Sequence, residues 1–214
     1  MKSKQSGFTL IEIAIVLVII GLLLGGVLKG QELINSAKVK NLAGDFKNIP
    51  VFIYGYQDKF KALPGDDSAA VTHVAATANG GGTGTINGKW NDVAGETFSF
   101  WQHVRLAGLA AGATDVAAAD YLPVNAVGGK IGITNSGATD SPITLPAPGI
   151  KGAYIVCSNG IAGKFVKQLD VTMDDGNTAT GSLQATAQGT SSGGTAVATA
   201  AIIDDTTYLV CMGV

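Results

Sequence analysis

The chain has 214 residues, enough for one ordinary domain and one additional element. Charged residues make up only 14% of it, which is low for a soluble cytosolic protein. The formal net charge of −2 argues against nucleic acid as a partner, because neutralising phosphates requires a basic surface.

The amino-terminal segment combines a short basic start with a long apolar run. Lys2 and Lys4 precede residues 8–28, which carry a single charge, that of Glu12. As a helix these 21 residues would be about 31 Å long, which matches a hydrocarbon core of roughly 30 Å. The lysines place the start in the cytoplasm under the positive-inside rule, so we expect one membrane span with the rest of the chain outside.

Two ordinary explanations of this segment are a cleaved secretory signal peptide and an uncleaved signal anchor. A cleaved secretory signal peptide is disfavoured, because the run is long and Lys29-Gly30-Gln31-Glu32 follows it in place of a small-x-small cleavage site. An uncleaved signal anchor explains the length but not Glu12. A carboxylate inside an apolar helix costs on the order of 3 kcal/mol and therefore requires a partner.

The string Gly7-Phe8-Thr9-Leu10-Ile11-Glu12 resembles the class III signal of type IV pilins and of type II secretion pseudopilins. In that family prepilin peptidase removes a basic leader directly after the glycine, and the new amino-terminal residue is N-methylated. The resemblance implies a cut between Gly7 and Phe8 and methylation of Phe8. The resemblance is close over about the first 30 residues. Beyond them only the general organisation of the family, a long amino-terminal helix, continues to residue 63.

Glu12 is the candidate assembly residue. Cleavage after Gly7 discards both leader lysines and exposes an α-amine with a pKa near 8. The protonated amine of Phe8 and the carboxylate of Glu12 on a neighbouring subunit would neutralise each other away from water, at less cost than two unpaired charges in lipid. The alternative is that Glu12 lies near the membrane interface and only snorkels to it.

Residues 29–62 are predicted to be an amphipathic continuation of the same helix. Apolar residues recur at steps of mostly three or four, from Leu33 to Phe60, which is the stripe of a half-buried helix. Pro50 is expected to interrupt this helix and to bend it near residues 46–50. Many pilins have a proline at the position of Lys29, whereas this chain has glycines nearby, which suit either local melting during assembly or close helix packing.

Residues 63–214 are expected to form a periplasmic or extracellular globular head. Residues 75–89 are predicted to be a flexible or turn-rich loop, and residues 96–110 a short amphipathic helix. Tyr154–Cys157 and Tyr208–Cys211 look like two related strands, Gly163–Leu169 a helical turn, and Ser182–Ala187 a further strand. The predicted fold class is α+β, in which the long amino-terminal helix packs on a small antiparallel sheet.

Cys157 and Cys211 are the chain's two cysteines. In an exported protein such a pair suggests one disulfide, and side-by-side strands would bring the two within bridging reach. Neither has a neighbouring Cys or His at zinc spacing. The pair also resembles the disulfide-bounded carboxyl-terminal loop of pilins, which favours a pilin slightly over a pseudopilin.

No catalytic set emerges from the sequence, so we expect no enzyme. His73 and His103 are far apart in sequence and are read as ordinary surface or core histidines. Calcium is the one cofactor considered, with Asp170, Asp174 and Asp175 as weak candidates within an acidic set that also includes Asn177, Asp204 and Asp205. The set resembles the carboxyl-terminal loop in which major pseudopilins bind calcium. Ordinary turn chemistry explains the Asp-Gly-Asn string at residues 175–177 equally well.

The sequence therefore predicts four segments: a leader at residues 1–7, a membrane and filament-core helix at 8–28, its amphipathic continuation at 29–62 and a head at 63–214. The expected function is that of a structural subunit of a type IV pilus-like filament. The expected partners are copies of the same chain in a helical filament, prepilin peptidase/methyltransferase and an inner-membrane assembly platform. A pseudopilin acting in protein export, or a minor pilin with an adhesive or DNA-binding head, is the alternative.

Overall fold

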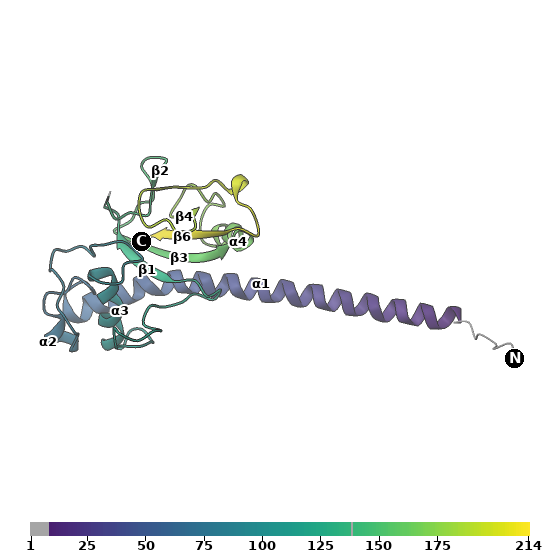
Figure 1. Cartoon of the computed structure of the whole chain (residues 1–214), viewed down its shortest axis with the longest axis horizontal. Coiled ribbons are helices and arrows are strands. Elements are labelled where there is room, and N and C mark those ends of the chain that lie inside the picture. Colours follow the sequence, from purple (N-terminus) through teal and green to yellow (C-terminus); the bar gives the residue numbers. More distant parts are fainter. Residues whose placement is uncertain (1–8, 138) are drawn as a thin grey trace. The chain divides into compact units, whose positions relative to one another are not determined.

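A computed structural model describes residues 9–137 and 139–214. These residues form two compact units, which divide between Ala37 and Lys38. The helices are α1 (Leu10–Phe60), α2 (Ala70–Val74), α3 (Glu96–Leu106), α4 (Gly163–Met173) and the 3₁₀ turn η1 (Thr199–Ala201). The strands are β1 (Ile131–Asn135), β2 (Ile143–Leu145), β3 (Tyr154–Ala162), β4 (Leu183–Ala187), β5 (Gly194–Thr195) and β6 (Thr207–Gly213) (Figure 1).

The second half of α1 supplies one wall of the core of the second unit. Its buried side chains follow the predicted helical stripe: Val39, Leu42, Phe46, Ile49, Ile53 and Tyr56. All of them except Tyr56 share one cluster with side chains of α3, α4 and the inner face of the sheet. The predicted α+β fold, a long helix packed on a small antiparallel sheet, is therefore confirmed.

Pro50 does not end the helix, because α1 continues through it to Phe60 as one helix. A proline inside a helix costs about 3 kcal/mol through one lost backbone bond and a steric clash. Phe46, Ile49 and Ile53 flank it and are at most 2% exposed. Each of these side chains gains about 1.5–3 kcal/mol from burial, so together they outweigh the cost of the proline.

The head contains a four-stranded antiparallel sheet in the order β1-β3-β6-β4. Side chains alternate between its two faces, as the period of a strand requires. Val156 and Val210 pack on the face toward α1, whereas Ile155 and Leu209 join a second cluster with Trp90 on the opposite face. A second sheet pairs β2 with β5 in parallel.

The strands predicted near Cys157, Cys211 and Ala187 are present as β3, β6 and β4. α3 confirms the predicted helix near residues 96–110, and α4 extends the predicted turn to Met173. The sequence reading missed α2 and the strands β1, β2 and β5.

The loop predicted to be flexible or turn-rich is held in place by buried and half-buried carboxylates. Asp66, which is 3% exposed, accepts hydrogen bonds from the amides of Thr83 and Gly84 at 2.8 and 2.6 Å. Glu96 accepts from the amides of Gly81 and Asn87 at 3.0 and 2.7 Å. The loop is irregular in backbone conformation, but side chains outside it satisfy its amides.

Both histidines lie around the end of α1. The Tyr56 hydroxyl donates to Asp67 at 2.7 Å, and His73 Nδ1 lies 2.7 Å from the same carboxylate oxygen. His103 is fully buried, and its Nδ1 accepts from the Gly65 amide at 2.9 Å. Burial alone would raise the pKa of Asp67, but hydrogen bonds from His73, the Ala69 amide and Tyr56 leave it below its usual value.

Tyr56→Phe is expected to lower the free energy of unfolding by about 1.5–3 kcal/mol, because it removes a donor from a buried carboxylate. Tyr56 and Asp67 are 0% and 2% exposed, so water does not replace the lost bond. Tyr54→Phe is the matched control, since Tyr54 is 60% exposed on the same helix. Chemical denaturation of the two variants should separate them, and equal midpoints would contradict this assignment.

Candidate functional site

The first unit is an apolar helical surface that no other described residue covers. The side chains from Leu10 to Leu28 are all exposed, although most are large and aliphatic. By length and composition α1 is the one helix among the described residues that can cross a membrane. Exposed aliphatic surface of this extent requires either lipid or other protein chains around it.

Glu12 lies at the start of this helix, in a hydrogen-bonded pair with Thr9. The Glu12 carboxylate accepts from the Thr9 amide at 2.8 Å and from the Thr9 hydroxyl at 2.7 Å. In return the Glu12 amide donates to the Thr9 hydroxyl oxygen at 3.3 Å. Since α1 begins at Leu10, Thr9 is its N-cap residue and Glu12 its third residue, which is the geometry of a capping box.

The capping box was missed in the sequence reading, although the Thr-x-x-Glu spacing of Thr9 and Glu12 is its usual signal. It gives Glu12 a partner within its own chain. The carboxylate satisfies one of the free amides at the helix start and lies at the positive end of the helix dipole. Gly7 and Phe8, the predicted cleavage and methylation residues, lie outside the described residues.

Cys157 and Cys211 form a disulfide between the two central strands of the sheet. They are paired directly in the register of β3 and β6, and both are fully buried. They belong to the cluster around Trp90 on the face of the sheet away from α1. The bridge therefore ties together strands that are 54 residues apart in sequence.

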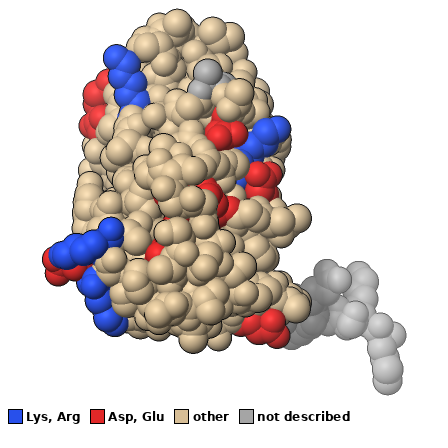
Figure 2. Space-filling model, turned by 90° about the vertical axis from the view of Figure 1, so that its left-hand side faces the viewer, with Lys and Arg blue, Asp and Glu red and all other residues tan. Residues whose placement is uncertain are grey.

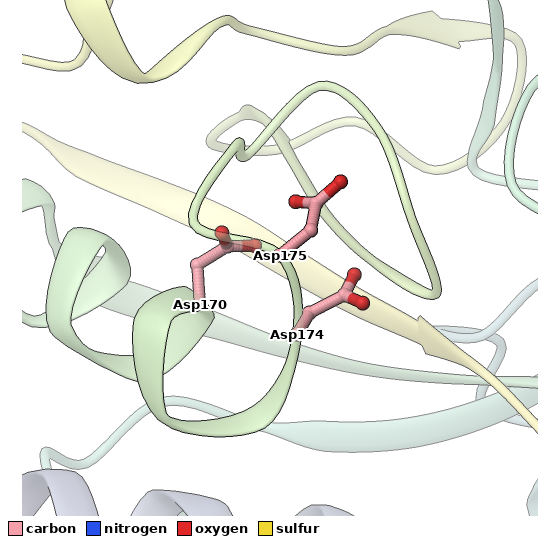
Figure 3. Close-up of side chains that lie close together, drawn as sticks. All are labelled: Asp170, Asp174 and Asp175. Carbon is pink, nitrogen blue, oxygen red and sulfur yellow. The ribbon is translucent and has the colours of Figure 1, made fainter.

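The acidic set of the carboxyl-terminal region is only partly brought together. Asp170 in α4 and Asp174 and Asp175 just after it form one cluster, in which one oxygen of each lies within 4.8 Å of the others (Figure 3). Asp204 instead binds Lys167 at 2.9 Å. Burial, followed by the charges of Asp174 and Asp175, raises the pKa of Asp170 to about 6.

A family model described as the prokaryotic N-terminal methylation motif matches residues 2–28. The chain carries a prepilin-type signal. The match covers most of the predicted leader, the predicted cleavage position, Glu12 and the apolar run, which are the residues that predicted the signal. Searches of the curated proteins and of the solved structures found no match.

The prepilin-type signal supports a type IV pilin-like or pseudopilin protein. It implies processing by prepilin peptidase and assembly in a filament, and it suits a chain anchored in the inner membrane by its apolar amino-terminal helix. The match ends at Leu28, so it describes the amino-terminal segment and says nothing of the head.

Proposed function

We propose that this protein is a structural subunit of a type IV pilus-like filament. The observation that carries the proposal is the prepilin-type signal on residues 2–28, followed by an apolar helix with one acidic residue, Glu12. Prepilin peptidase cuts after Gly7, and Phe8 becomes the methylated amino terminus. The chain then leaves the membrane for a filament whose core consists of bundled first halves of α1.

The exposed helix supports this route, because the same apolar surface suits lipid before assembly and neighbouring helices after it. Before assembly the subunit is a single-pass inner-membrane protein with its amino terminus in the cytoplasm and its head in the periplasm. An inner-membrane assembly platform receives it. The filament then lies at the cell surface or within the periplasm.

Glu12 specifies the register in this proposal. In the free chain its carboxylate is bound by Thr9. In the filament the cleaved amine of Phe8 on a neighbouring subunit competes with Thr9 for the same carboxylate and neutralises its charge. A charge pair buried between subunits fixes which residue of one helix lies beside which residue of the next.

The alternative functions differ mainly in the assembly to which the subunit belongs, a pilus or a type II secretion pseudopilus. A pseudopilin in protein export shares the amino-terminal chemistry, and the disulfide near the carboxyl terminus favours a pilin only slightly. An adhesive or DNA-binding minor pilin would need a suitable surface on the head. On the face displayed in Figure 2, basic side chains are few and lie near acidic ones, which gives little support to DNA binding.

Mass spectrometry of sheared filaments tests the proposal. The expected subunit begins at N-methylated Phe8 and has the disulfide intact. Recovery of the uncleaved chain, or of a chain cut elsewhere, would contradict the processing route. Electron microscopy of the same cells distinguishes a pilus from a pseudopilus. Filaments on the cell surface at native expression support a pilus, and their absence there supports a pseudopilus.

A further inference from the structure

A groove of about 640 Å³ lies beside α3 in the head. α3 contributes Phe98 and Arg105 to it, and most of the other lining residues belong to the segment after this helix, residues 111–124. The walls are largely apolar and include Phe98, Val116 and Leu122. The volume is within the range of small-molecule sites, which is roughly 300–1,000 Å³.

Arg105 lines this groove although it is almost completely buried, with 7% of its surface exposed. Its Nε donates to the Ala111 carbonyl at 3.3 Å. Its Nη1 donates to the carbonyls of Ala113 and Tyr121, at 2.8 Å and 2.5 Å. All three acceptors are neutral and belong to the segment that follows α3. These bonds therefore fix the guanidinium in place without neutralising its charge.

The remaining nitrogen of Arg105, Nη2, is open to the groove. A guanidinium has five N–H donors, and the three carbonyls occupy those on Nε and Nη1. Within residues 9–137 and 139–214, Nη2 has no hydrogen-bond partner and is not an enclosed atom. Gly112 leaves it uncovered, because a Cβ at that position would lie 2.8 Å from Nη2. Two donors of a buried cation are thus left facing a cavity.

No acidic side chain of the described residues forms an ion pair with Arg105. The other charged residues that line the groove, Asp120 and Lys130, are both exposed. Burial lowers the pKa of Arg105, and the neighbouring Tyr121 and Asp120 offset only part of this effect. Arginine remains protonated at neutral pH, so the groove contains a buried positive charge without a bound counter-ion.

We propose that this groove binds a small monocarboxylate with an apolar body, such as a short-chain fatty acid. The carboxylate accepts hydrogen bonds from Nη2 of Arg105 and supplies the missing negative charge. The apolar body lies against Phe98, Val116 and Leu122 and displaces water from them. Hydrogen bonds between a guanidinium and a carboxylate are about twice as strong as neutral ones, and arginine is the cation best suited to a buried ion pair.

The charges of the groove favour this class of ligand over two others. Two basic side chains and one acidic side chain line it, so a single negative charge balances them. A phosphate monoester carries about −1.5 to −2 charge at pH 7 and exceeds that balance. A neutral apolar ligand would leave Arg105 unpaired. All residues of the groove belong to the head, so binding does not require assembly into a filament.

NMR titration of the isotopically labelled full chain in detergent with hexanoate tests this proposal. The signals of the Arg105 Nε–H and the Gly112 amide should shift and saturate, with a Kd on the order of 1 mM. Acetate lacks the apolar body and hexanol lacks the charge, so each should bind at least about 10-fold more weakly. Shifts confined to the first half of α1 would indicate only partition into detergent and would overturn the proposal, as would equal affinities for hexanoate and hexanol.

Two exposed variants with the same change of charge locate the effect. Asp120→Asn removes the negative charge near Arg105 and should tighten hexanoate binding by about two- to five-fold. Asp205→Asn is the matched control, because Asp205 is exposed and does not line the groove. Both variants leave the carbonyl bonds of Arg105 in place, so the comparison does not depend on a change in folding. Equal affinities of the two variants would also overturn the proposal.

Discussion

Glu12→Leu is expected to abolish filament assembly while leaving cleavage after Gly7 largely intact. In the proposed function the peptidase acts on the leader, whereas the carboxylate of Glu12 is needed only later, to pair with the amine of a neighbouring subunit. Removing one partner from a buried charge pair costs about 3–5 kcal/mol, because it leaves the other charge unpaired. A loss of this size weakens each subunit addition by about 100-fold or more.

The capping box makes a control necessary, since Glu12→Leu also removes a helix cap. Glu12→Gln keeps the capping geometry but not the charge, because glutamine serves equally well at this position. Thr9→Val does the opposite, since it removes the hydroxyl and keeps the charge. Loss of filaments in Glu12→Gln with normal filaments in Thr9→Val would assign the effect to charge pairing.

Glu32→Gln is a further control for the loss of a carboxylate elsewhere on α1. Glu32 is exposed and binds Lys29 at 2.7 Å, an arrangement worth little in water. Filaments recovered by shearing and detected by immunoblot are the measurement, with the cleaved and uncleaved forms resolved by mass. Normal filaments in Glu12→Leu would contradict the proposed role of this residue.

Removing the disulfide is expected to cost about 4 kcal/mol of the free energy of unfolding. The bridge closes a loop between residues 54 apart in sequence, and the chain-entropy model assigns a loop of that size about this value. Domains of this kind are stable by about 5–15 kcal/mol, so the loss is a large fraction of the total. The loss of stability should affect the whole head, because β3 and β6 are the two central strands of its sheet.

The test compares the unmodified protein with the double variant Cys157→Ala/Cys211→Ala in urea, each with and without reductant. Alanine avoids placing an unpaired buried thiol or hydroxyl in the cluster around Trp90. Reductant should lower the midpoint of the unmodified protein and leave that of the variant unchanged. If reductant has no effect on either, the bridge contributes no stability.

Local patterns predicted the long helix, because a helical stripe depends on residues three and four positions apart. They also predicted the strands around the cysteines, where an aromatic residue and an aliphatic pair precede each Cys. β1 was missed because it contains Gly132 and follows two further glycines, which weaken any strand signal. Its five residues are buried through pairing with β3, a contact that sequence spacing does not reveal.

Pro50 shows how packing can outweigh a local preference. Considered alone, a proline inside a helix removes one backbone hydrogen bond and clashes with the preceding turn. The buried side chains on both sides of it keep α1 continuous, because their burial is worth more than the bond that proline removes. The loop at residues 75–89 is a second case, in which carboxylates distant in sequence satisfy the amides of a glycine-rich segment.

The sequence by itself determined the amino-terminal chemistry, since leader, apolar run and Glu12 are contiguous and their order is the signal. Only the tertiary structure decided which distant residues meet. It separated Asp204, bound by Lys167, from Asp170, Asp174 and Asp175, and it buried Asp170 without a partner. The physical reason is that burial and counter-charge depend on the packing of α4 against the sheet, which no spacing along the chain specifies.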